Sequence, residues 1–368
     1  MLRKDRASRQ IKVLVVDDSA VVRQVLEAVL SQEPDLAVMV AADPLIAQQK
    51  MARSRPDVIV LDLEMPRMDG LAFLRKIMAT DPIPTVICSG VAGRGTQAAL
   101  RALEEGAVGI VTKPKLGVRN FLYESGLELT DMVRAAAGAR IRPLHALDVK
   151  PAAPRKHLPH RHDIFLQRLV AIGASTGGTE ALTEILTAMP QDSPGIVVVQ
   201  HMPEVFTAAF ADRLNQLSMI EVKEAEDGDH VSPGRALIAP GNRHMSVRRR
   251  GKEIFVELND GPLISRHRPS VDVLFRSVAQ AAGANGLGII LTGMGNDGAQ
   301  GLLEMKKCGA ETVAQDEASC VVFGMPKEAI ACGAVDQVLP LARIPARILM
   351  TAAKKKPLRH TSMAALTQ

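Results

Sequence analysis

The sequence predicts two α/β domains, an N-terminal doubly wound domain and a C-terminal domain with a mostly parallel sheet. In both halves of the 368-residue chain, short runs of Val, Ile and Leu alternate with longer amphipathic stretches. Between the halves, a segment rich in Pro, His and basic residues interrupts this alternation. We therefore expect domains at 11–140 and 164–350, a flexible basic linker at 141–163 and a mobile tail at 351–368.

Five β-rich runs mark the strands of the first domain, and each is followed by a stretch with the periodicity of a helix. These runs are Ile11–Val16, Leu36–Ala41, Val58–Leu61, Thr85–Cys88 and Val108–Val111. Such β/α units build a parallel sheet whose ligands bind beyond the carboxyl ends of the strands. Polar residues that follow these runs are therefore the first candidates for a functional site.

The second domain begins near Phe165 and has more continuous apolar runs, which suit strands buried on both faces. We expect its central strands at Leu169–Gly173, Ile196–Gln200 and Leu287–Leu291. A β-richer segment from Glu221 to Leu258 interrupts the alternation of strands and helices. This segment therefore departs from the strand-helix alternation of the rest of the domain.

The composition gives little support for nucleic-acid binding. Aromatic residues make up 2% of the chain and Trp is absent, so few side chains are available to stack on bases. The formal charge is +5, but seven Lys and Arg lie between positions 140 and 168, and four more lie in the tail. We interpret this charge as belonging to the linker and the tail, so no nucleic-acid partner is expected.

Two further observations suggest a cytoplasmic protein without membrane insertion. The N-terminus is polar, and no run of about 18 uncharged apolar residues follows it. The four cysteines, at 88, 308, 320 and 332, form no CxxC pair and have no His at zinc-finger spacing. Neither a disulfide framework nor a cysteine metal site is indicated.

Carboxylates gather at the strand ends of the first domain. Asp17 and Asp18 end the first strand and Asp62 ends the third, so the three acids are expected to lie together and to bind Mg²⁺. Ser89 and Lys113 end the fourth and fifth strands. A carboxylate nucleophile, a divalent ion, a hydroxyl and a cation suit phosphoryl transfer. Taken singly, each aspartate could instead cap the helix that follows it.

With these residues, the first half resembles the response-regulator receiver family, a flavodoxin-like doubly wound fold. The matching motifs are Asp17-Asp18, Asp62, Met65-Pro66-Arg67-Met68-Asp69-Gly70, Ser89 and Lys113-Pro114. The resemblance implies that Asp62 accepts phosphate from a partner histidine kinase and that Ser89 and Lys113 contact the phosphoryl group. It also implies Mg²⁺ ligands at Asp17, Asp18, Asp62 and the backbone carbonyl of Glu64. One departure is Ile110, which stands where receivers usually have an aromatic switch residue.

Three polar residues follow strands of the second domain. Ser175 lies in a Gly-rich turn between a strand and a helix expected over Thr179–Met189, His201 follows the next strand, and Asp297 lies in a Gly-rich loop after a later one. Taken singly, the turn could bind phosphate, the histidine could be structural and the aspartate could form a turn. Together they supply a nucleophile, a general base and a group that orients the base.

The second half resembles the catalytic domain of the chemotaxis protein-glutamate methylesterases. The matching segments are Gly173–Gly178, Gln200–Pro203, Ala239–Gly241, His267–Asp272, Thr292–Gly298 and Ala318–Pro326. The resemblance implies Ser175 as nucleophile, His201 as general base and then acid, Asp297 as the orienting group and the Met294 amide in the oxyanion hole. It implies methylated chemoreceptors as substrates, deamidation of receptor glutamines as a second reaction, and no cofactor for ester hydrolysis. Asn242 stands where the family often has Asp.

Two rival functions remain from the sequence. One is a phosphorylation-gated binding protein such as a transcription regulator, although no helix-turn-helix pattern is present. The other is a nucleotide site at the Ser175 loop, although the second half contains neither a P-loop GK[ST] nor a full GxGxxG. Neither rival accounts for His201 and Asp297.

Overall fold

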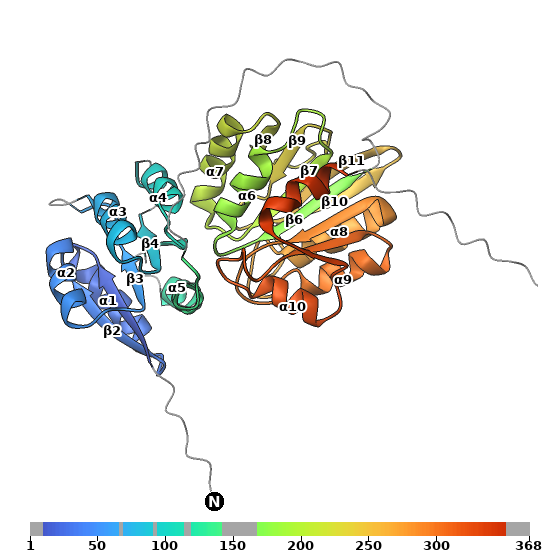
Figure 1. Cartoon of the computed structure of the whole chain (residues 1–368). Helices are drawn as coiled ribbons and strands as arrows, with labels where there is room; N and C mark the ends of the chain where they lie inside the picture. The colour runs from blue at the N-terminus through green and yellow to red at the C-terminus, as the bar shows by residue number, and fades with distance from the viewer. Residues whose placement is uncertain (1–9, 66–68, 91–93, 114–118, 142–167, 351–368) are drawn as a thin grey trace, which may run out of the picture.

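The computed structural model describes residues 10–65, 69–90, 94–113, 119–141 and 168–350 (Figure 1). The expected linker, apart from Ile141, and the expected tail lie outside these residues, as do positions 66–68 of the receiver-like motif and Pro114. In the part of the chain that is described, no helix is both long and apolar enough to cross a membrane.

The first domain is a parallel sheet with the strand order β2-β1-β3-β4-β5. This is the doubly wound order expected from the sequence, and the order in which strands are added to the sheet reverses between β1 and β3. The predicted strands are confirmed to within one residue: β1 Ile11–Val16, β2 Leu36–Ala41, β3 Val58–Leu61, β4 Thr85–Ser89 and β5 Gly109–Thr112. The helices are α1 Ala20–Leu30, α2 Pro44–Arg53, α3 Gly70–Thr80, α4 Arg94–Glu104 and α5 Arg119–Ala137.

Side-chain caps fix where three of these helices begin. Ser19, Asp43 and Asp69 each accept a hydrogen bond from an amide in the first turn of α1, α2 and α3. Such caps satisfy amides that have no partner inside the helix. None of the three is a predicted site residue, so the capping role considered for Asp17 and Asp62 is taken by other side chains.

The second domain contains a larger parallel sheet with the order β14-β13-β12-β6-β7-β9-β8. Its strands are β6 Leu169–Ala174, β7 Gly195–Gln200, β8 Glu221–Glu224, β9 Arg235–Ile238, β12 Gly286–Ile290, β13 Glu311–Gln315 and β14 Gln337–Leu339. An antiparallel hairpin lies outside this sheet, with β10 at His244–Arg250 and β11 at Glu253–Asn259. The prediction of a mostly parallel sheet is confirmed, and the β-richer segment supplies two strands of that sheet, β8 and β9, as well as the hairpin.

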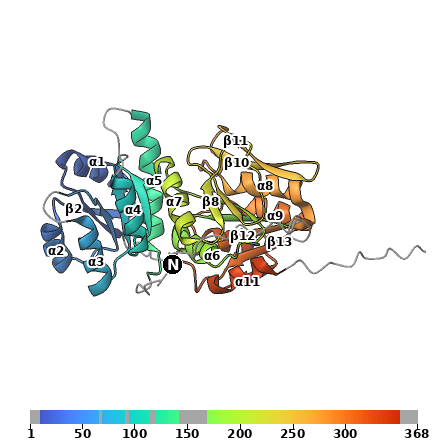
Figure 2. The same cartoon turned by 90° about the horizontal axis from the view of Figure 1, so that it is seen from above.

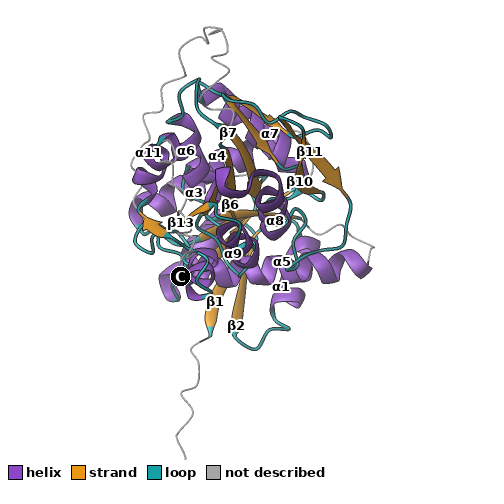
Figure 3. Ribbon diagram, turned by 90° about the vertical axis from the view of Figure 1, so that its right-hand side faces the viewer, coloured by secondary structure: helices purple, strands orange, loops and turns teal. Residues whose placement is uncertain are grey.

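Helices cover both faces of this second sheet. They are α6 Gly178–Thr187, α7 Glu204–Leu217, α8 Val271–Ala282, α9 Ala299–Lys307, α10 Met325–Ala331 and α11 Ile344–Leu349. Helices α8 and α9 pack side by side, and α8 also packs against the β10–β11 hairpin (Figure 3). The strand order reverses between β6 and β12, and such a switch point is where open α/β sheets bind ligands.

The two domains pack against each other through α4, α5 and the start of β5 on one side and α6, α7 and nearby loops on the other (Figures 1 and 2). One apolar cluster includes buried residues of both domains, among them Leu100 of α4 and Phe206 of α7. Polar contacts flank it: Arg213 pairs with Glu104 at 2.7 Å and Arg140 pairs with Glu317 at 2.7 Å. The receiver-like domain therefore packs against the second domain through an apolar surface that is flanked by ion pairs.

Removal of the Phe206 ring tests this packing. Phe206 is fully buried in the cluster, and we expect Phe206→Ala to lower the free energy of unfolding by about 3–5 kcal/mol. The measurement is urea unfolding followed by circular dichroism. The exposed Val338→Ala serves as the control, with a change within about 0.5 kcal/mol expected. Equal losses for both variants would contradict this account of the core.

Candidate active and phosphorylation sites

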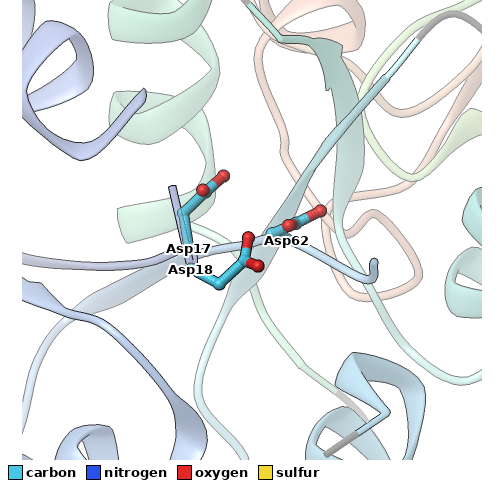
Figure 4. Close-up of side chains that lie close together, drawn as sticks. All are labelled: Asp17, Asp18 and Asp62. Atoms are coloured by element: carbon cyan, nitrogen blue, oxygen red, sulfur yellow. The ribbon is translucent and has the colours of Figure 1, made fainter. Parts of the chain in front are cut away.

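The ends of β1 and β3 bring three carboxylates together, as predicted. Asp17 and Asp62 are almost fully buried and Asp18 is exposed. One ligand oxygen from each lies within 4.8 Å of the others (Figure 4). Oxygen ligands at this spacing, with one carboxylate open to solvent, fit a hard divalent cation such as Mg²⁺.

Lys113 neutralises part of this acidic cluster. Its ammonium lies 2.7 Å from Asp62 Oδ2 and 3.0 Å from Asp17 Oδ2. Burial raises the pKa of Asp17, and hydrogen bonding to Lys113 opposes that rise. Burial alone would lower the pKa of Lys113, but the hydrogen bonds to Asp62 and Asp17 outweigh it and the pKa is raised. The cluster therefore holds a fixed positive charge beside the carboxylate of Asp62.

The remaining predicted residues of this site surround Asp62. Ser89 is buried at the end of β4, and its backbone carbonyl accepts a 2.9 Å hydrogen bond from the Lys113 amide. The Glu64 amide donates to Asp62 Oδ1 at 3.1 Å, so the chain after β3 folds back over the acid. Ile110 is buried in the apolar cluster shared by the two domains. Ile110, which departs from the usual receiver pattern, is thus an aliphatic packing residue.

Ser175, His201 and the loop after β12 meet at the switch point of the second sheet. Ala174 at the end of β6 pairs in register with Gln200 at the end of β7, so Ser175 and His201 follow neighbouring strand ends. The Ser175 amide donates to the Thr292 carbonyl at 3.1 Å, which ties the serine turn to the loop after β12. The structure brings together the residues predicted from three strand ends that are distant in sequence.

Asp297 forms a hydrogen bond with one ring nitrogen of His201. His201 Nε2 lies 2.9 Å from Asp297 Oδ2, and both side chains are buried. With the aspartate ionised, Nε2 carries the proton that it donates, and Nδ1 holds the lone pair. Among the described residues, no group hydrogen-bonds His201 Nδ1. That nitrogen therefore keeps a free lone pair that can accept a proton.

The start of α8 holds Asp297 in its ionised form. The Ser270 hydroxyl donates to Oδ1 at 2.7 Å, the Val271 amide donates to Oδ2 at 2.7 Å and the Asp272 amide donates to Oδ1 at 3.1 Å. Burial would raise the pKa of Asp297, but the bonds from His201, Ser270 and Val271 outweigh it and lower the pKa to about 2. The carboxylate is thus a permanent negative charge at the helix start.

Sequence reasoning assigned no role to several residues that complete this site. The His267 ring stacks on His201, with ring centroids 3.7 Å apart. The Gln200 amide nitrogen donates to the backbone carbonyls of Ser175 and His201 at 2.9 and 3.0 Å. The Thr292 hydroxyl donates to the Thr176 carbonyl at 2.9 Å. His267, Gln200, Thr292 and Thr176 lie only within the longer matching segments of the sequence, and nothing in their spacing marked them individually.

The receiver-like domain contacts the serine turn directly. The Gly177 amide donates to the Val108 carbonyl at 3.3 Å, and the Thr176 hydroxyl lies 3.7 Å from Met132 Sδ on α5. Arg266, close to His267, pairs with Asp131 of α5 at 3.4 Å. In this arrangement α5 lies beside the residues that would bind a substrate.

Two family models match the chain. The response regulator receiver domain matches residues 13–118, and the CheB methylesterase matches residues 170–348. The "Protein-glutamate methylesterase/protein-glutamine glutaminase 5" of Anaeromyxobacter dehalogenans is 60% identical, with 93% of this chain and 97% of that protein covered. The "Protein-glutamate methylesterase/protein-glutamine glutaminase 2" of Pseudomonas syringae pv. tomato is 56% identical, with 93% of this chain and 99% of that protein covered.

Among solved structures, the Thermotoga maritima CheB methylesterase catalytic domain is similar to the second half of the chain. It is 42% identical, and the match covers 49% of this chain and 96% of that one with a TM-score of 0.48.

The stacked histidine gives the stability a pH dependence. Burial and the charge of His201 lower the pKa of His267 to about 3, so below its ordinary value of about 6.5 the unfolded chain binds a proton that the folded chain does not. The free energy of unfolding is therefore expected to fall as the pH falls from 6.5 toward 3. His267→Gln should flatten this slope in urea unfolding at pH 7, 6 and 5.

The exposed His230 provides the matched control, and His230→Gln should keep the slope of the wild type. A slope for His267→Gln equal to that of the wild type would show that His267 does not carry this dependence.

Proposed function

Because this chain belongs to the CheB methylesterase family and carries an N-terminal response-regulator receiver domain, we propose that it is a phosphorylation-activated hydrolase of chemoreceptor glutamate methyl esters. The relatives' names add glutaminase activity, so deamidation of receptor glutamines to glutamate is proposed as its second reaction. Removal of the esters would reset receptor sensitivity in chemotaxis. We propose the cytoplasm as the place of action, with a histidine kinase as phosphodonor.

One observation carries the proposed chemistry: Ser175, His201 and Asp297 converge at the switch point, with Asp297 bonded to His201. A serine hydroxyl needs a base to act as a nucleophile near neutral pH. His201 Nδ1 would take the Ser175 proton, while Nε2–H donates to Asp297 and the aspartate stabilises the imidazolium that forms. The ring thus uses its two nitrogens for separate tasks.

The reaction proceeds by acyl transfer in this proposal. Ser175 Oγ bonds to the ester carbonyl carbon, and the carbonyl oxygen becomes an oxyanion that the Met294 amide would bind. His201 returns the proton to the departing oxygen, which releases methanol and leaves an acyl-enzyme. Water, deprotonated by His201, then attacks the acyl carbon and frees the glutamate carboxylate and Ser175. With a glutamine side chain, the same steps release ammonia.

In the receiver domain, Asp62 would attack the phosphoryl group of a kinase phosphohistidine. Lys113 and Ser89 would bind the phosphoryl oxygens, since Lys113 already contacts Asp62 and Ser89 lies at the next strand end. Asp17, Asp18, Asp62 and the Glu64 carbonyl would hold Mg²⁺, which supplies positive charge that offsets the charge of the transferring phosphoryl group.

The domain contact supports a negative control by the receiver. Val108 and Met132 contact Gly177 and Thr176, the two residues that follow Ser175. We infer that the unphosphorylated receiver restricts access to the serine. Phosphate at Asp62 would compete for Lys113 at the carboxyl end of β5, and a resulting shift of β5 would be transmitted to Val108 at its other end.

The chemistry is tested by methanol release from methylated chemoreceptor membranes. The wild type should release methanol, and Ser175→Ala should lower the rate at least about 10³-fold because the covalent step is lost. Ser246→Ala, a serine of the β10–β11 hairpin outside the site, is the control and should keep the wild-type rate. Methanol release by Ser175→Ala at the wild-type rate would refute the assignment of the nucleophile.

The control is tested with a small-molecule phosphodonor in the same assay. The donor should stimulate the wild type several-fold and should leave Asp62→Asn at its unstimulated rate, because the amide cannot accept phosphate. Asp57→Asn, a nearby aspartate that contacts the Lys12 amide, should respond as the wild type does. Equal stimulation of the wild type and Asp62→Asn would contradict control through Asp62.

A further inference from the structure

A two-residue turn carries Arg266 next to the catalytic histidine. Ile264 and His267 exchange backbone hydrogen bonds of 3.1 and 2.8 Å, and the two residues between them, Ser265 and Arg266, have φ values of 50° and 68°. Two positive φ values define a type I′ turn, which normally contains Asn or Gly. Backbone strain of this kind at residues with side chains is typical of functional sites.

The segment around this turn is firmly held. The Arg268 guanidinium donates to Asn242 Oδ1 at 2.6 Å and to the Gly261 carbonyl at 2.9 Å. His267 is fixed by its stack on His201, and the positive charge of Arg266 contributes to the lowered pKa of His267. The turn therefore holds the Arg266 charge close to the reacting centre, although 75% of the Arg266 side chain remains exposed.

The only carboxylate that pairs with Arg266 in the described residues is Asp131 of the receiver helix α5, at 3.4 Å. The next residue of α5, Met132, contacts Thr176 beside the nucleophile. Glu128 lies one helical turn before both and so shares their face of the helix. The Glu128 side chain is exposed to solvent. Desolvation by the surrounding protein raises the pKa of Glu128, and the charge of His201 opposes that rise. Helix α5 thus places Asp131 against Arg266 and carries a second carboxylate, Glu128, three residues earlier on the same face.

We propose that Arg266 is a specificity residue that binds a carboxylate of the receptor about one helical turn from the reacting glutamate, and that α5 inhibits by presenting Glu128 and Asp131 in its place. The proposal rests on the proposed function. Glu128 has the same side chain as the glutamate that hydrolysis of the methyl ester would produce. In this view α5 is a product-like helix built into the chain, and an acidic helical segment of the receptor replaces it.

The strength of the contact suits an exchangeable inhibitor. The pair between Arg266 and Asp131 is solvent-exposed, with 75% and 40% of the two side chains accessible. Ion pairs of this kind contribute little and are screened by salt. A substrate carboxylate can therefore displace Asp131 without a large cost, whereas a buried pair would keep the site closed.

The substrate role is tested in the full-length chain with saturating phosphodonor. For methylated receptor membranes, Arg266→Ala should raise KM about three- to tenfold and leave kcat within about twofold of the wild type. A small neutral substrate, the γ-methyl ester of N-acetylglutamate α-amide, should be hydrolysed by both proteins at the same kcat/KM. Arg248→Ala removes another exposed, ion-paired arginine, on the β10–β11 hairpin, and should change neither substrate's kinetics.

The inhibitory role is tested without phosphodonor. Asp131→Asn and Glu128→Gln should each raise receptor demethylation about two- to fivefold, and Asp131→Asn should leave the donor-stimulated rate unchanged. An unchanged KM for Arg266→Ala, an equal loss on the neutral ester, or no gain from Asp131→Asn would overturn the proposal. If the wild type hydrolyses neither substrate, the proposed function itself fails, which is a distinct result.

Discussion

The buried carboxylate of Asp297 is the constraint on which the second domain's site depends. An ionised group in the interior is costly unless hydrogen bonds replace its hydration, and here the start of α8 and the His201 ring provide them. These bonds fix the loop after β12, the end of β7 and the start of α8 relative to one another. Each of these segments would lose a polar partner if another moved.

The two domains have the same type of architecture but carry different sets of side chains at their strand ends. In each, the strand order reverses within the sheet, and the predicted site residues follow the strands on either side of that point. The first domain gathers acids around Lys113, and the second pairs a histidine with one aspartate that neutral donors surround. The shared fold brings the loops after several strands together, and the residue types at the strand ends determine which chemistry each site could support.

Much of this arrangement could be predicted because it depends on local patterns. Continuous apolar runs marked the strands, and the polar residues after them were expected to meet since parallel strands end at one edge. The contacts of His267 and Arg266 could not be predicted, because a loop far along the chain brings them to the site. The choice of Nε2 for Asp297 depends on ring orientation, about which sequence carries no signal. The catalytic roles themselves stay predictions.

The packing of α5 beside the serine turn has a thermodynamic consequence. If phosphate at Asp62 weakens this packing, the two events are linked, and linkage between binding equilibria acts in both directions. A receptor segment that displaces α5 would then favour phosphorylation of Asp62 by the same free energy with which phosphorylation favours receptor binding. Phosphorylation of the receiver would then depend on the occupancy of the esterase site as well as control access to that site. Methylated receptors would therefore influence which enzyme molecules carry phosphate.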